Sequence, residues 1–221
     1  MSKKCLLLMA VFFSSLGFSL SAQNIISAIK GAFGGGRETV TVSPEELYDL
    51  TLEENLMIPE LGSTAEAVRE YQHNEALKIK REHYKVETTR NGEVIIVTIP
   101  AESLFAPSDT LLLDSSHKLL RNMFRYLEVP DFYRMLIVMH HDNTGSSQYT
   151  FNLTRRRIEA VFNWFESQNV NTDYVIPYAM GDKQPLKFNT SFRSRQANRR
   201  LEIYLVPGTA LIAAAKKGNL K

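Results

Sequence analysis

The chain has 221 residues, of which 44% are hydrophobic and 23% charged, with 11 Gly, 8 Pro and a single Cys. This composition excludes collagen, a disulfide-stapled scaffold and a wholly disordered protein. The formal net charge of +2 is too small to create a polyanion-binding field over the whole surface, so nucleic acid is not expected as a partner.

The first 22 residues have the pattern of a secretory signal peptide. Lys3 and Lys4 precede a short apolar run over 5–13, and small residues lead to Ala22. A retained N-terminal anchor is the alternative interpretation. Removal of this segment leaves 24 basic and 24 acidic residues and no cysteine. We therefore expect an exported mature chain without disulfides or Cys-ligated metals, and no later stretch is apolar enough to predict a transmembrane helix.

The next two segments precede the more regular part of the sequence. Residues 23–37 include three consecutive glycines and predict a flexible linker, because such a run is costly to order. Residues 38–92 form an N-terminal segment of unknown role. In it, Ser43 and Pro44 favour the start of a helix, and 64–81 is rich in helix formers.

A β-hairpin is predicted at the end of this segment. Two β-prone runs, 84–89 and 93–99, are joined through Asn91 and Gly92, which is the strongest short-range hairpin signal in a sequence. Pro100 ends the second strand.

Helices and strands then alternate as far as residue 207. Apolar spacing predicts helices over 111–127 and 152–168, and strands over 135–139, 174–180 and 200–206. The connecting loops are too short to separate domains. We expect an α+β fold: a two-layer α/β sandwich over 93–207, with a mixed sheet of about four strands and helices on one face. An Ala/Lys-rich tail, 208–221, follows and is a further candidate helix.

Most catalytic templates are missing from the sequence. It has no nucleophile elbow, phosphate loop, dinucleotide fingerprint or zinc-protease helix motif. His140 and His141 precede Asp142, but neighbouring strand residues point to opposite faces, so a shared metal ion is not expected. A hydrolase using either histidine as base is a further hypothesis, although no nucleophile accompanies it. We predict a protein without enzymatic activity, cofactor or metal.

Four motifs in order resemble the OmpA-like peptidoglycan-binding domain. They are the turn Met139 to Gly145, the helix segment Asn152 to Val161, the loop Met180 to Pro185, and the closing segment Asn189 to Ile203. Leu104-Phe105 and Leu112 to Leu120 fit the start of that family's domain. The resemblance covers residues 94–206, about half the chain, and implies the OmpA C-terminal-like fold.

The resemblance also implies a function and a site. In this family a strand-end Asp and a helix Arg, fifteen positions apart, hold the charged end of diaminopimelate in a peptidoglycan stem peptide. The matching residues are Asp142 and Arg157, whose charges suit an ammonium and a carboxylate. The expected localisation is the periplasm, near the outer membrane and cell wall, with outer-membrane or envelope proteins as further candidate partners. The remaining expected ligand-binding residues are Asn143, Thr144, Gly145, Thr150, Leu153, Thr154 and Arg200.

Some positions depart from the family pattern. His141 replaces a Thr, Thr150 replaces an Asn, Met139 replaces a Gly and Ile158 replaces an Ala. Thr150 supplies only one hydroxyl where the amide has two polar ends. The alternative hypothesis is therefore an envelope structural or assembly protein that keeps the fold without binding peptidoglycan, with residues 38–92 as its working surface.

Overall fold

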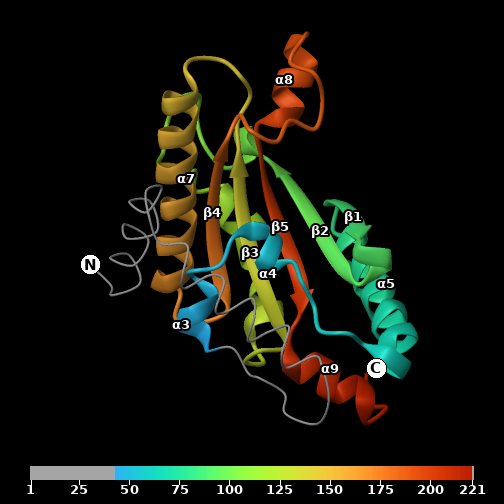
Figure 1. Cartoon of the computed structure of the whole chain (residues 1–221). Coiled ribbons are helices and arrows are strands. Elements are labelled where there is room, and N and C mark those ends of the chain that lie inside the picture. The colour runs from blue at the N-terminus through green and yellow to red at the C-terminus, as the bar shows by residue number, and fades with distance from the viewer. Residues whose placement is uncertain (1–42, 221) are drawn as a thin grey trace, which may run out of the picture. The chain divides into compact units, whose positions relative to one another are not determined.

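The computed structural model describes residues 43–220 (Figure 1), so the predicted signal peptide and the 23–37 linker lie outside the described residues. The chain divides into two units between Thr51 and Leu52, so residues 43–51 and 52–220 are described separately. In the first unit, α3 (Pro44–Leu47) begins after Ser43, whose backbone N–H donates to the Glu46 carboxylate at 2.9 Å, and whose hydroxyl accepts from the Glu46 N–H. This capping box confirms the predicted helix start.

A five-stranded mixed sheet forms the centre of the second unit. Its spatial order is β1-β2-β5-β3-β4, and only β3 and β4 run parallel to each other. The α+β fold is therefore confirmed, with one strand more than expected. The additional strand belongs to the predicted hairpin, which pairs β1 with β2 and carries the sheet across the expected 92/93 boundary. The strands are β1 (Lys85–Thr89), β2 (Val94–Pro100), β3 (Tyr133–His140), β4 (Val175–Gly181) and β5 (Arg200–Pro207).

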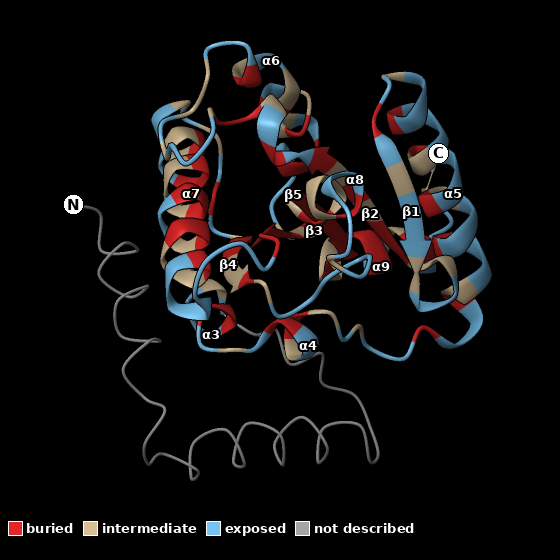
Figure 2. Cartoon of the chain, turned by 90° about the horizontal axis from the view of Figure 1, so that it is seen from above, coloured by how far each residue is buried: buried red, intermediate tan, exposed pale blue. Residues whose placement is uncertain are grey.

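One face of the sheet packs against two long helices. α7 (Ser147–Ser167) connects β3 to β4 and packs on both, whereas α5 (Ala65–Arg81) packs on β1 and β2. Figure 2 shows α7 beside β4 and α5 beside β1, with the buried strands between them. Apolar residues at paired positions, such as Ile137 and Ile203, are fully buried. β3 is buried along most of its length and contains the continuous apolar run 135–139. β5 is also buried throughout, although it includes the charged residues Arg200 and Glu202.

The other face of the sheet is also covered near β3 and β4. Asn55, at the end of α4 (Leu52–Asn55), donates to the Tyr178 hydroxyl at 2.6 Å and accepts from Arg134 at 3.3 Å. Arg134 and Tyr178 lie on this face because strand side chains alternate. α4 has only four residues, too few to show helical periodicity, so the sequence did not predict that it covers this face of the sheet.

Several boundaries differ from the sequence expectation. The helix predicted from residue 152 begins at Ser147, where the Ser146 hydroxyl accepts from the Tyr149 N–H. The helix predicted over 111–127 is two short pieces, and a short helix, α8, was not predicted. The remaining elements are η1 (Gly62–Thr64), η2 (Arg90–Gly92), η3 (Ala101–Ser103), α6 (Ser116–Arg121), η4 (Phe124–Leu127), α8 (Phe192–Asn198) and α9 (Thr209–Lys216).

The C-terminal tail is helical and attached to the sheet. Gly208 donates to the Phe132 carbonyl at 2.9 Å, and the Thr209 N–H donates to the Asp131 carboxylate at 3.2 Å. α9 then packs against α5, which gives the tail a partner that its sequence did not identify. Within residues 43–220, no helix has both the length and the apolar character needed to cross a bilayer.

Candidate ligand-binding site

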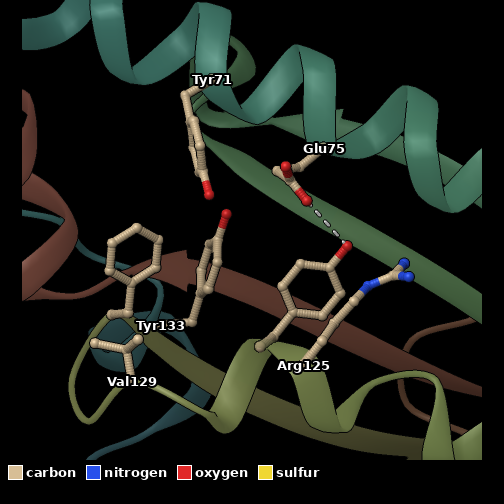
Figure 3. Close-up of a pocket in the computed structure, with 7 residues that line it drawn as sticks. Tyr71, Glu75, Arg125, Val129 and Tyr133 are labelled. Carbon is tan, nitrogen blue, oxygen red and sulfur yellow. Dashed lines mark hydrogen bonds between the residues drawn. The ribbon is translucent and has the colours of Figure 1, made fainter. Parts of the chain in front are cut away.

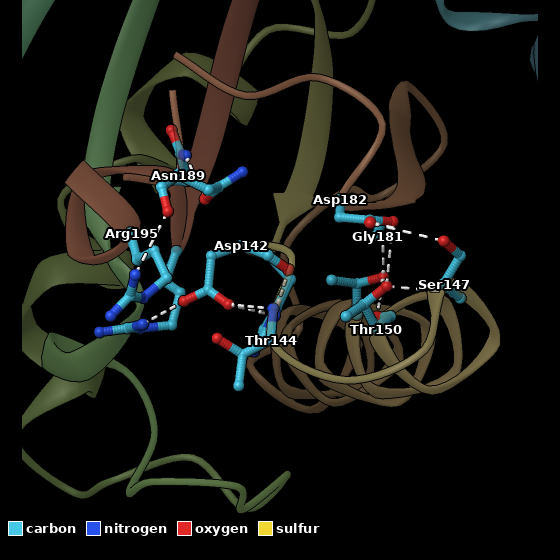
Figure 4. A network of polar contacts seen from close by, with 12 residues as sticks. Asp142, Thr144, Ser147, Thr150, Gly181, Asp182, Asn189 and Arg195 are labelled. Atoms are coloured by element: carbon cyan, nitrogen blue, oxygen red, sulfur yellow. Dashed lines mark hydrogen bonds and ion pairs between the residues drawn. The ribbon is translucent and has the colours of Figure 1, made fainter. Parts of the chain in front are cut away.

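The centre of the candidate site is Asp142, just beyond the end of β3. Its side chain has 0% exposure, and its Oδ1 accepts a hydrogen bond from the Thr144 N–H at 2.7 Å. Its Oδ2 accepts from a guanidinium N–H of Arg199, which lies at the junction of α8 and β5 (Figure 4). Asp142 is therefore a buried carboxylate held by a turn on one side and by a cation on the other.

These contacts keep the Asp142 carboxylate ionised. Burial by itself would raise the pKa of Asp142, but hydrogen bonds from Thr144 and Arg199, together with the nearby His141, lower it below its usual value. Arg199 is 26% exposed at its side chain, so one partner of this buried charge is reachable from solvent.

The Arg157 side chain extends from α7, and its guanidinium is hydrogen-bonded to backbone carbonyls. Its Nε donates to the carbonyl of Asp109 at 2.8 Å and its Nη2 to that of Ala106 at 3.2 Å, while the guanidinium lies 4.9 Å from the centre of the Phe105 ring. The residue is 4% exposed. Burial lowers the pKa of Arg157, and the positive charge of Arg199 lowers it further.

Asp142 and Arg157 are therefore not in direct contact, and no hydrogen bond or ion pair joins them in the described part of the chain. Asp142 has Arg199 as its ionic partner, while Arg157 is occupied by backbone oxygens and lies within electrostatic reach of Arg199. The Arg199 guanidinium is the positively charged group that contacts the Asp142 carboxylate. The arrangement is one carboxylate and two guanidiniums, which is suited to a ligand that carries both an ammonium and carboxylates.

Thr150 and Thr154 join the start of α7 to the end of β4. The Thr150 hydroxyl donates to the Ser147 carbonyl at 3.0 Å and to the Asp182 carboxylate at 3.2 Å. The Thr154 hydroxyl accepts from the Gly181 N–H at 3.1 Å and donates back into its own helix. In Figure 4 this group lies on one side of Asp142, and Arg195 and Asn189 lie on the other.

The turn between β3 and α7 is exposed. Asn143, Thr144 and Gly145 are all solvent-accessible, and Gly145 has φ +98°, a conformation that favours glycine. Leu153, one helical turn before Arg157, is buried with 7% exposure. The turn is thus the accessible edge of the site, and Leu153 is part of its interior support.

Arg200 lies in a separate buried cluster. Its Nε donates to the Glu202 carboxylate at 2.7 Å and its Nη2 to the Gln184 carbonyl at 3.2 Å. Glu202 also accepts from the Tyr204 hydroxyl at 2.5 Å, and His140 Nε2 lies 3.2 Å from it. Arg200 therefore holds Glu202 and the 183–199 loop, whereas the adjacent Arg199 contacts Asp142.

The positions that depart from the family pattern are mostly interior. Met139 and Ile158 are fully buried, and the His141 Nδ1 lies 2.9 Å from the Asp142 carbonyl oxygen. Ile158 therefore fills core space behind Arg157. In the part of the chain that the structure describes, no three His, Cys, Asp or Glu side chains are grouped so as to hold a metal ion.

A pocket of about 230 Å³ lies elsewhere, between α5 and η4 (Figure 3). Its lining contains none of the residues predicted from the sequence. The Tyr126 hydroxyl donates to Glu75 at 3.3 Å, and Glu75 is already paired with Lys78 at 2.6 Å. Arg125 at its edge is paired with Glu82. The pocket is lined by Tyr71, Glu75, Arg125, Tyr126, Val129, Phe132 and Tyr133.

The fold and the order of its elements are those of an OmpA-like domain. Residues 104–199, a little under half of the chain, match the model of the OmpA family.

Individual relatives support this assignment. The chain is 25% identical over 122 residues to the probable lipoprotein YiaD of Escherichia coli strain K12, covering 55% of this chain and 56% of that protein. It is 24% identical over 110 residues to outer membrane protein A of Bordetella avium, covering 50% and 57%. The matches thus span a little over half the length of these curated relatives.

A solved structure shares the fold. A MotB-like protein from Desulfovibrio vulgaris superposes with a TM-score of 0.59 at 20% identity, covering 66% of this chain and 95% of that one.

Proposed function

We propose that the domain over residues 93–207 binds peptidoglycan non-covalently, through the diaminopimelate residue of a stem peptide, and so links the envelope to the cell wall. The proposal rests on the match of residues 104–199 to the OmpA family and on the resemblance of its motifs to the peptidoglycan-binding form of that domain. The single observation that carries it is the buried, ionised Asp142, which is ion-paired with the partly exposed Arg199.

The proposed binding step is an exchange of cations. The ligand ammonium replaces the Arg199 guanidinium on Asp142, which keeps the buried charge paired throughout. Arg199, once released, pairs with a ligand carboxylate. The fixed positive charge of Arg157 adds to the attraction for that carboxylate. The amides of Asn143 and Gly145 supply further donors at the accessible edge, while that of Thr144 stays on Asp142.

The proposed setting is the periplasm, at the outer membrane or cell wall. Its support is the signal-peptide pattern of residues 1–22 and the similarity to two relatives, one named as a probable lipoprotein and the other as an outer membrane protein. The proposed role is that of a binding protein and not of an enzyme, because the sequence carries no nucleophile beside His140 or His141.

The distribution of exposed apolar side chains bears on the alternative of an assembly protein working through residues 38–92. Among the described residues of that segment, only Met57 and Leu77 are large, apolar and exposed. Six others lie in the OmpA-like domain, three of them close together in one loop. This distribution favours the domain as the working surface.

Co-sedimentation with isolated peptidoglycan sacculi tests the proposal. Asp142→Asn is expected to weaken binding at least about tenfold, because removing one partner of a desolvated charge pair costs about 2–5 kcal/mol. Arg157→Ala removes the positive charge behind Arg199 and is also expected to weaken binding. Asp114→Asn and Arg156→Ala, which change exposed residues, are the matched controls. Wild-type protein that stays in the supernatant, or an Asp142→Asn variant that sediments equally well, contradicts the proposal.

A further inference from the structure

The loop between β4 and β5 exposes three large apolar side chains within seven residues. Leu186 is 46% exposed, Phe188 88% and Phe192 69%. Such clusters mark interaction sites more often than isolated exposed residues do, since burying them against a partner is favourable. We refer to residues 183–199, which include α8, as the basic-aromatic loop.

The same loop is rich in positive charge. Five of its residues are Lys or Arg, and the one acidic residue of the connection between β4 and β5, Asp182, precedes it and accepts from the Thr150 hydroxyl. Lys187 and Arg193 are exposed beside the two phenylalanines. The loop therefore concentrates cations in a chain whose overall charge is nearly balanced, which favours an anionic partner. Its basic residues are Lys183, Lys187, Arg193, Arg195 and Arg199.

Buried polar groups hold the loop in this conformation. The Asn198 side chain, which is fully buried, accepts from the Lys187 N–H at 3.0 Å and donates to the Lys187 carbonyl at 2.8 Å. Ser191 and Ser194 form a reciprocal cap at the start of α8. The backbone is thus fixed from within while the phenylalanines face outward, so the surface is organised before a partner arrives.

The loop is continuous with the site around Asp142. Arg199, its last residue, donates to Asp142, and its guanidinium lies 5.8 Å from the centre of the Phe192 ring. Figure 4 shows Asn189 and Arg195 of the loop beside Asp142, and Figure 1 shows α8 near the end of β3. A polymer whose charged end occupies Asp142 would therefore extend over the exposed phenylalanines.

We infer that the basic-aromatic loop is the second half of the binding site and takes the glycan and peptide of peptidoglycan beyond the amino acid bound at Asp142. This inference rests on the proposed function. The apolar faces of sugar rings pack on Phe188 and Phe192, and free carboxylates of the stem peptides pair with Lys187 and Arg193. The site thereby distinguishes the polymer from a free amino acid.

Two ligands of different size separate this inference from the proposed function. The double variant Leu186→Ser/Phe188→Ser, which leaves Phe192 beside Arg199 in place, is measured against sacculi by co-sedimentation, and against a soluble diaminopimelate-containing tripeptide by calorimetry. We expect at least tenfold weaker binding to sacculi and less than twofold change for the tripeptide. Met57→Ser/Leu77→Ser, which removes exposed apolar side chains elsewhere, is expected to bind both like wild type.

A variant that removes positive charge tests the contribution of the loop's basic residues. Lys187→Gln/Arg193→Gln is expected to weaken binding to sacculi and to reduce its dependence on salt, because screened charge pairs are removed. Circular dichroism melts confirm that each variant is folded.

Three results overturn the inference. One is a Leu186→Ser/Phe188→Ser variant that binds sacculi like wild type while wild type binds both ligands; the proposed function then stands alone. Another is a loss of binding to vesicles of phosphatidylglycerol with binding to sacculi unchanged, which assigns the loop to a lipid surface. If wild type binds neither sacculi nor tripeptide, the proposed function and the inference both fail.

Discussion

Arg199 donates a hydrogen bond to Oδ2 of Asp142, although the two residues lie 57 positions apart in the chain. The contact joins the end of β3 to the junction of α8 and β5. It also means that the buried carboxylate is already paired, so any cationic ligand competes with an internal guanidinium. Binding at this site is therefore an exchange and not the filling of an open charge.

The first prediction concerns the pKa of Asp142. Replacing Arg199 with Ala removes one of the contacts that favour the ionised form, so the pKa of Asp142 should rise. NMR titration of the side-chain carboxyl carbon measures it. Arg195→Ala is the control, because Arg195 donates to the Asn189 carbonyl and not to Asp142. An unchanged pKa in Arg199→Ala would show that Thr144 and His141 keep the carboxylate ionised without Arg199.

The second prediction concerns acid stability and Glu202. Burial alone would raise the pKa of Glu202, but contacts with His140, Arg200 and Tyr204 lower it from 4.5 to about 2. Because the folded pKa lies below the unfolded one, this stabilisation is complete above about pH 4.5 and is lost as the pH falls toward 2.

Glu202→Gln should therefore flatten the decline of the unfolding free energy below about pH 5. Urea denaturation at a series of pH values measures it, with Glu66→Gln, at an exposed position of α5, as the control. A decline in Glu202→Gln as steep as that of wild type would place the acid sensitivity elsewhere. His140 contributes in a different pH range. Burial lowers the pKa of His140 from its ordinary value of 6.5, so the free energy of unfolding falls as the pH drops below about 6.5.

The third prediction concerns Gly181, which ends β4 beside the candidate site. Its φ is +55°, and a Cβ there would lie 3.1 Å from the backbone nitrogen of Phe151. Gly62 has a similar φ of +51° with nothing within 4 Å. Gly62→Ala should cost about 1 kcal/mol from backbone conformation alone. Gly181→Ala should cost roughly 1–3 kcal/mol more, because α7 must shift. Equal losses in thermal melts would show that the contact with Phe151 relaxes freely.

The elements that depend on local signals could be predicted from the sequence. The hairpin follows from Asn91 and Gly92, both of which have positive φ in the turn. The buried strand at 135–139 follows from its unbroken apolar run. By contrast, the first turn of α7, from Ser147, carries no apolar stripe, and α8 depends on Asn198 and the Ser191 cap for its place. Such elements are set by tertiary contacts and not by periodicity.

The candidate site could be predicted only in part. Asp142 and Arg157 were identified through the motif, and they lie at the end of β3 and on α7 as that motif implies. The contact from Arg199 was not predicted, because Arg199 and Arg200 are adjacent and a shift of one residue exchanges their faces. Where β5 begins decides which arginine reaches Asp142. The carbonyls of Ala106 and Asp109 that hold Arg157 leave no sequence signal, since any residue carries one.

The most direct test of the account is a crystal structure of the protein soaked with diaminopimelate. We expect a ligand ammonium within hydrogen-bonding distance of the Asp142 carboxylate, with the Arg199 side chain displaced from Oδ2 and a ligand carboxylate on a guanidinium. A structure at saturating ligand in which Arg199 still occupies Asp142, or in which the ligand binds elsewhere, would contradict it.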